Sequence, residues 1–162
     1  FQKRDLEILG ITDPNPEKQA MDVLDKIWSM YEICGVSMLD ISVWKWMYAH
    51  PDATAEQLKE ATIALSKEIW NKYYAPVFGV KDETVLAVYS HMISYPLYLS
   101  AYAFGQIIEL QLDQYLEGKD FANEVERIFR QGCLTPNQWI ILATGSPLTV
   151  EPMLEAVREV IK

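Results

Sequence analysis

A histidine and several tyrosines between positions 91 and 102 have side chains and a spacing suited to binding chemistry. These residues are His91, Tyr95, Tyr98 and Tyr102. Positions i, i+4, i+7 and i+11 form one stripe on a continuous helix. Imidazole and phenol groups can donate hydrogen bonds to a carbonyl or to a developing oxyanion. Pro96 lies inside the run and can begin a new helix, leaving His91 on the preceding turn, whereas Tyr98 and Tyr102 share a face in either case.

The same spacing also has an interpretation as ordinary packing. Tyrosines at helical intervals are commonly half-buried with satisfied hydroxyls, and a single histidine is commonly structural. Periodicity alone favours packing over a binding site for these four residues.

Metal ligands and covalent nucleophiles have little support in the sequence. The chain has two histidines, His50 and His91, and no HExxH motif, which places two zinc-binding histidines on one helix face. Cys34 and Cys133 do not stand at the short spacings of zinc sites from each other or from the histidines. Ser146 follows a glycine but is not part of a G-x-S-x-G turn. We therefore predict no metal site made by this chain alone, and no nucleophile.

Composition excludes several classes of partner. The 162 residues include 14 Lys and Arg against 23 Asp and Glu, and the net charge of −9 argues against binding nucleic acid. No apolar run approaches the ~20 residues of a membrane span, and the first residues lack the apolar stretch of a secretory leader. The two cysteines fit unpaired thiols in a reducing compartment, with a single disulfide left open. The cysteine count favours a cytoplasmic protein, although a leader upstream of Phe1 would be invisible here.

Turn and capping residues divide the chain into helical segments. Thr54–Gln57 and Thr135–Gln138 each predict a capping box, and Gly118 and Gly145 predict helix ends. No segment alternates with the period of two that is typical of strands. We therefore predict one all-α domain over residues 1–162, with about six to eight helices. The predicted segments lie near 17–30, 36–48, 54–76, 82–94, 96–117, 120–132, 135–145 and 149–161.

Apolar patterning predicts which faces are buried. The 36–48 segment is apolar on nearly all sides, which is typical of a buried helix. In the following segment, one apolar stripe is formed by Ala61, Leu65, Ile69 and Tyr73.

The residues around the tyrosines resemble those of a known family. His91, then Pro96-Leu97-Tyr98, then Tyr102 are similar to a histidine, an aromatic-tyrosine step and a later tyrosine in the thimet oligopeptidase and oligoendopeptidase F zinc peptidases. Looser similarity continues through residues 103–112. Flanking motifs also resemble the family: Trp46-x-Tyr48-x-His50-Pro51 with the helix start at Thr54, and later Gly132, Pro136 and the short helix to Gly145.

The resemblance implies a fold and an activity. It implies the helical C-terminal part of a gluzincin oligopeptidase, in which a deep channel admits short peptides. The zinc ligands of that family, HExxH and a later glutamate, would lie upstream of Phe1. The chain would then be a C-terminal fragment that is inactive alone. Its partners would be a short peptide substrate and the missing N-terminal part, with zinc bound only in the full-length parent.

The resemblance also implies roles for the four residues. His91 and Tyr95 would bind the substrate, and Tyr102 with Tyr98 would stabilise the tetrahedral oxyanion. Leu97 replaces the usual aromatic, and Ser100 stands where a further tyrosine often occurs, which leaves open how many phenols line the channel.

Two other classes of function remain open. The chain could be a non-catalytic helical module that binds peptides in the same groove, or a structural interaction domain. A peptidase fragment predicts an exposed apolar face and self-association. A free-standing module predicts a monomer that does not bind a hydrophobic dye, so size-exclusion chromatography with a dye assay separates the two.

Overall fold

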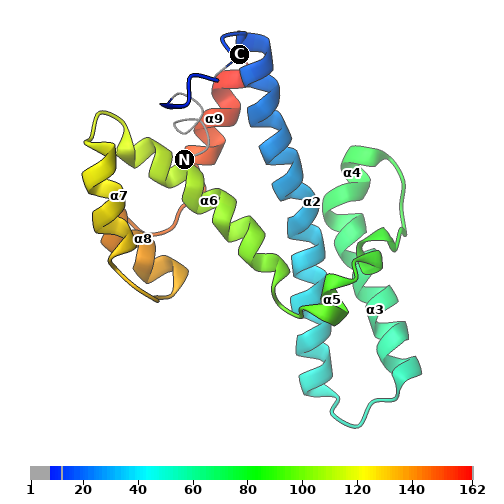
Figure 1. Cartoon of the computed structure of the whole chain (residues 1–162). Coiled ribbons are helices and arrows are strands. Elements are labelled where there is room, and N and C mark those ends of the chain that lie inside the picture. Colours follow the sequence, from blue (N-terminus) through cyan, green and yellow to red (C-terminus); the bar gives the residue numbers. More distant parts are fainter. Residues whose placement is uncertain (1–7, 12, 162) are drawn as a thin grey trace. The chain divides into compact units, whose positions relative to one another are not determined.

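The computed structural model describes residues 8–11 and 13–161, and all regular secondary structure in these ranges is helical (Figure 1). The all-α prediction is therefore confirmed. In chain order the elements are α2 (Pro16–Ala49), α3 (Ala55–Ile69), the π-helical turn η1 (Trp70–Tyr74), α4 (Ala75–Phe78), the 3-10 turn η2 (Val85–Val88), α5 (His91–Ser94), α6 (Leu99–Leu116), α7 (Phe121–Phe129), α8 (Pro136–Thr144) and α9 (Glu151–Ile161). Within these ranges, no helix combines the length and apolar character needed to cross a bilayer.

The chain forms two compact units. Unit 1 comprises Phe1–Trp28 with Phe104–Lys162, and unit 2 comprises Ser29–Ala103. Helices α2 and α6 each begin in one unit and end in the other. That the whole chain behaves as a single domain stays a prediction. All four residues of the predicted site belong to unit 2.

The core of unit 2 joins the second part of α2 to the end of α3 and to the segments after it. Burial of these apolar side chains away from water is the main favourable contribution to the folding of unit 2. The buried residues of this core are Val36, Leu39, Ile69, Trp70, Tyr74, Ala75, Leu86 and Leu99.

Helix α2 is continuous, whereas the sequence predicted two segments, 17–30 and 36–48. The helix passes through Gly35, a residue that normally weakens a helix interior. Here glycine is required, because a Cβ at Gly35 would lie 2.0 Å from the Tyr74 hydroxyl oxygen. That hydroxyl donates a hydrogen bond of 2.6 Å to the Tyr31 carbonyl of the same helix. Burial raises the pKa of Tyr74 to about 12, so the phenol remains a donor.

The prediction that residues 36–48 are buried on all sides is wrong. Val36 and Leu39 are fully buried, but Met38 and Ile41 are exposed and Tyr48 is 74% exposed. Only one face of this part of α2 packs into the core of unit 2.

The predicted stripe of α3 shifts by one residue at its end. Within η1, the Ala75 N–H bonds to the Trp70 carbonyl five residues back, so one extra residue enters the turn. Tyr74 is consequently buried, and Tyr73 at the predicted position is 40% exposed. Pro76 accounts for the wide turn, since its ring cannot fit against the carbonyl four residues earlier.

The prediction of one helix over residues 82–94 is also wrong. This stretch contains only the short elements η2 and α5, and Asp82 has a positive φ of 61°. The next helix begins at Leu99 instead of Pro96, because Leu97 has a φ of 63°, which a right-handed helix does not accommodate.

Of the two predicted capping boxes, one forms. The Thr54 hydroxyl accepts from the Gln57 N–H, and the Gln57 side chain accepts from the Thr54 N–H, so this box is confirmed. At α8 the prediction is wrong: the Thr135 hydroxyl instead donates to Gln138 Oε1 at 2.9 Å and does not cap the backbone.

Unit 1 packs α6, α7 and α8 around a second apolar core. Its buried members are Leu112, Leu116, Ile128, Ile140 and Ala143. Arg127 donates to the carbonyls of Leu142 and Ala143 at 3.2 and 2.6 Å, at the end of α8 where helix carbonyls lack internal partners. Gly145 then ends α8 with a φ of 81°, as predicted.

Candidate functional site

The four residues of the predicted site form a continuous series of neighbouring rings, although they do not lie on one helix. We call this series the aromatic row: His91 begins α5, Tyr95 follows its end, Tyr98 precedes α6 and Tyr102 lies in α6. Successive ring centroids are 6.1, 6.3 and 5.3 Å apart, within the range of attractive aromatic pairs. Tyr98 and Tyr102 meet edge to face, at 86°.

The tyrosines of the row are exposed. Tyr95 is 64%, Tyr98 52% and Tyr102 47% exposed, and His91 is partly buried. Among the described residues, none forms a hydrogen bond with these three hydroxyls. The packing interpretation requires half-buried rings with satisfied hydroxyls, and these tyrosines do not have that arrangement. Their donors are available to a ligand.

The row bends at Leu97, and a buried carboxylate fixes the bend. The Leu97 N–H donates to Asp40 Oδ2 at 2.7 Å, and Asp40 is only 1% exposed. This bond satisfies a backbone donor in the left-handed conformation that Leu97 adopts, which is unfavourable for residues other than glycine. Asp40 therefore positions the segment between Tyr95 and Tyr98.

Sequence reasoning missed Asp40. A signal was present, because Asp40 is the one acidic residue in the strongly apolar 36–48 stretch. Burial raises the pKa of the Asp40 carboxyl, and the Leu97 amide and the Trp44 side chain offset part of that shift. Asp40 Oδ1 is buried and has no hydrogen-bond partner in the described part of the chain.

The chain does not supply a zinc site within residues 8–11 and 13–161. No group of three or more His, Cys, Asp or Glu side chains in these ranges could hold a metal ion. Cys34 and Cys133 are free thiols, and burial raises the pKa of Cys34.

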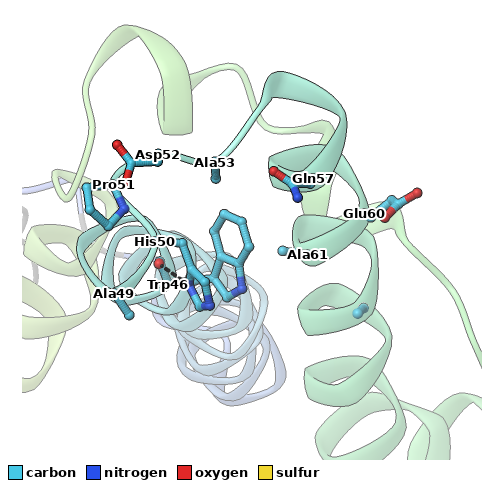
Figure 2. A pocket seen from close by; sticks show the side chains of 10 residues that line it. Trp46, Ala49, His50, Pro51, Asp52, Ala53, Gln57, Glu60 and Ala61 are labelled. Carbon is cyan, nitrogen blue, oxygen red and sulfur yellow. Dashed lines mark hydrogen bonds between the residues drawn. The ribbon is translucent and has the colours of Figure 1, made fainter.

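A pocket of about 630 Å³ lies where the end of α2 meets the start of α3 (Figure 2). Trp46 and His50 stack on each other inside it, with ring centroids 4.3 Å apart and an interplanar angle of 18°. Both residues belong to the motif at positions 46–51 that resembles the peptidase family, but the sequence predicted no pocket there. The lining consists of Trp46, Ala49, His50, Pro51, Asp52, Ala53, Gln57, Glu60, Ala61 and Ala64.

Comparison with known proteins adds no assignment. No protein-family model, curated protein or solved structure matches this chain.

Proposed function

We propose that unit 2 binds short peptides along the aromatic row, as the C-terminal substrate-binding part of a zinc-dependent oligopeptidase. The observation that carries this proposal is the exposed row itself, with three phenol hydroxyls that have no hydrogen-bond partner among the described residues. The family resemblance of residues 91–102 supplies the peptidase part of the proposal.

The spacing of the row suits an extended peptide. In an extended chain, groups on the same side recur every two residues, or about 6.6 Å. The ring-to-ring distances along the row, 5.3 to 6.3 Å, are close to this repeat. Successive phenols can therefore donate to carbonyls on one side of a bound peptide, and their rings can pack against its side chains.

The proposal gives the row residues two kinds of role. His91 and Tyr95 bind the peptide, with the imidazole donating to a substrate carbonyl. Tyr98 and Tyr102 donate hydrogen bonds to the oxygen that becomes negatively charged during hydrolysis. The zinc ligands and the general base belong, in this proposal, to a different segment of the parent protein. The chain by itself should then bind peptides without hydrolysing them.

Binding to the row is tested with the full 162-residue chain and a short fluorescein-labelled, alanine-rich peptide, followed by fluorescence anisotropy. Tyr95→Phe, Tyr98→Phe and Tyr102→Phe keep the rings and remove the hydroxyls. Each should weaken binding about two- to tenfold, since a hydrogen bond contributes about 0.5–1.5 kcal/mol net. Tyr48→Phe is the matched control, because Tyr48 is exposed and lies outside the row. Equal effects of all four substitutions would reject binding at the row.

The peptidase part of the proposal has a separate test. The complete coding sequence is determined and searched for HExxH with a later glutamate, and the full-length protein is assayed for peptide hydrolysis. His91→Ala and Tyr102→Phe should lower kcat/KM of that enzyme. Peptide binding by a full-length protein that does not hydrolyse peptides would instead identify a non-catalytic module. An unchanged kcat/KM in both variants would contradict the roles assigned to His91 and Tyr102.

A further inference from the structure

Two rings of the aromatic row, those of Tyr98 and Tyr102, stand almost perpendicular to each other on unit 2. Their centroids lie 5.3 Å apart, and their planes meet at 86°. In such an edge-to-face pair, a ligand group placed beside the contact can touch the faces of both rings. The two side chains are 52% and 47% exposed, so their rings reach solvent. We call these two residues the tyrosine pair.

The ring faces of the tyrosine pair are suited to a cation. The face of an aromatic ring attracts cations, because its π electrons give it a partial negative charge. Elsewhere the chain makes this contact with its own side chains. Lys72 Nζ lies 4.9 Å from the centroid of the Tyr73 ring. Lys119 Nζ lies 4.5 Å from the centroid of the Tyr115 ring. In the part of the chain that the structure describes, no lysine or arginine takes this position over the tyrosine pair, so a cation from a ligand can do so.

The charges of the chain also favour a cation at the tyrosine pair. Positions 84–108 contain no lysine, arginine, aspartate or glutamate, so no basic residue of this segment repels one. The carboxyl of Asp40 accepts a hydrogen bond from the N–H of Leu97, the residue that precedes Tyr98. The net charge of −9 adds a general attraction for cations.

The negative charge of Asp40 is not neutralised by a neighbour. None of the ion pairs among the described residues involves Asp40. Its side chain is 1% exposed, and its Oδ1 has no hydrogen-bond partner within the described ranges. A charge that is removed from water acts more strongly on its surroundings than an exposed one. Asp40 therefore contributes negative potential to the segment that carries the tyrosine pair.

We propose that the tyrosine pair binds a lysine or arginine side chain, and that the ligand of unit 2 is a cationic peptide. This inference rests on the proposed peptide binding along the aromatic row and adds the class of peptide. The phenol hydroxyls bond to peptide carbonyls, and the cation lies against the ring faces. An uncharged side chain of the same shape contacts the rings without this electrostatic attraction. Since the hydroxyl and the ring face are different parts of one side chain, substitutions can separate their contributions.

Two fluorescein-labelled, alanine-rich peptides test the inference with the full 162-residue chain. They differ only at the central position, which is lysine in one peptide and norleucine in the other. Norleucine has a methyl group in place of the ammonium group, so the ratio of the two Kd values measures the effect of the charge. By fluorescence anisotropy, the lysine peptide should bind about two- to fivefold more tightly, as expected for a cation–π contact at an exposed site. High salt should reduce this preference.

Variants of the chain show whether the preference for lysine comes from the ring faces. Tyr98→Leu and Tyr102→Leu each remove a ring and should bring the Kd ratio close to one. Tyr98→Phe removes only the hydroxyl, so it should weaken the binding of both peptides and leave the ratio unchanged. Asp40→Asn should reduce the preference without abolishing it, because the rings remain. Tyr48→Leu is the matched control, since Tyr48 is 74% exposed and lies outside the row, and it should leave the ratio unchanged.

Three results would overturn the inference. Equal affinity of the wild-type chain for the two peptides would reject the cation and leave peptide binding in place. A preference that persisted in both leucine variants of the tyrosine pair would assign it to the net charge of the chain instead of the ring faces. Failure of both peptides to bind would reject this inference together with the peptide-binding proposal.

Discussion

Asp40 Oδ2 accepts a hydrogen bond of 2.7 Å from the backbone N–H of Leu97, a residue 57 positions later in the sequence. The bond joins a buried face of α2 to the one bend in the aromatic row. It also satisfies the amide of a residue with a φ of 63°. The geometry of the candidate site therefore depends on a carboxylate that lies outside it.

Substitution of Asp40 tests this dependence. Asp40→Ala removes the acceptor and leaves the Leu97 N–H without a protein partner, so the free energy of unfolding should fall by about 1–3 kcal/mol in urea denaturation. Asp40→Asn keeps an acceptor oxygen and should preserve the bend, seen as unchanged NMR shifts of the Tyr95 and Tyr98 rings. A loss of those shifts in Asp40→Asn would show that the charge, and not the acceptor, holds the segment.

The stability of Asp40→Asn relative to the wild-type chain should change with pH in a definite direction. Burial raises the pKa of Asp40 in the folded state above its ordinary value of 3.8. The folded protein therefore holds this proton more tightly than the unfolded chain does. That contribution to stability is fully present below pH 3.8 and is lost as the pH rises through the folded-state pKa. Asparagine does not titrate, so the stability of Asp40→Asn relative to wild type should rise over this pH range. Asp52→Asn, at an exposed position, is the control, and a relative stability that falls with pH would contradict the prediction.

Two glycine-to-alanine substitutions should have opposite effects on stability. Gly35→Ala places a methyl group against the buried Tyr74 ring and should destabilise the chain by about 1–3 kcal/mol. Gly105 lies inside α6, and a Cβ there would contact no atom within 4 Å. Gly105→Ala should therefore stabilise the chain by about 0.5–1 kcal/mol. Thermal unfolding followed by circular dichroism measures both effects. Equal effects of the two substitutions would show that Tyr74 does not pack on Gly35.

The two threonines before α3 and α8 should also differ. Thr54→Ala removes a helix cap and should cost about 1 kcal/mol in urea denaturation. Thr135→Ala removes a hydroxyl that does not cap the backbone, so its effect should stay within about 0.5 kcal/mol. A cost at Thr135 that matched the cost at Thr54 would indicate that both capping boxes form in solution.

The features predicted correctly from the sequence depend on neighbouring residues. The helical class, the Thr54–Gln57 box and the end of α8 at Gly145 are set by apolar periodicity and by caps that act over a few residues. The members of the aromatic row could be named for the same reason, because their spacing and side-chain types are visible in the chain. Their roles in binding stay predictions.

The features that the sequence did not reveal depend on contacts between distant residues. Helix α2 continues through Gly35 because Tyr74 packs there, and the row bends at Leu97 because Asp40 holds its amide. The turn at Trp70–Tyr74 contains an extra residue, which buries Tyr74 in place of Tyr73. The sequence by itself determined the helical class, the Thr54–Gln57 cap and the end of α8, and it named the members of the aromatic row. Tertiary structure decided where helices continue, bend and present those side chains, because burial and long-range hydrogen bonds outweigh local preferences at these positions.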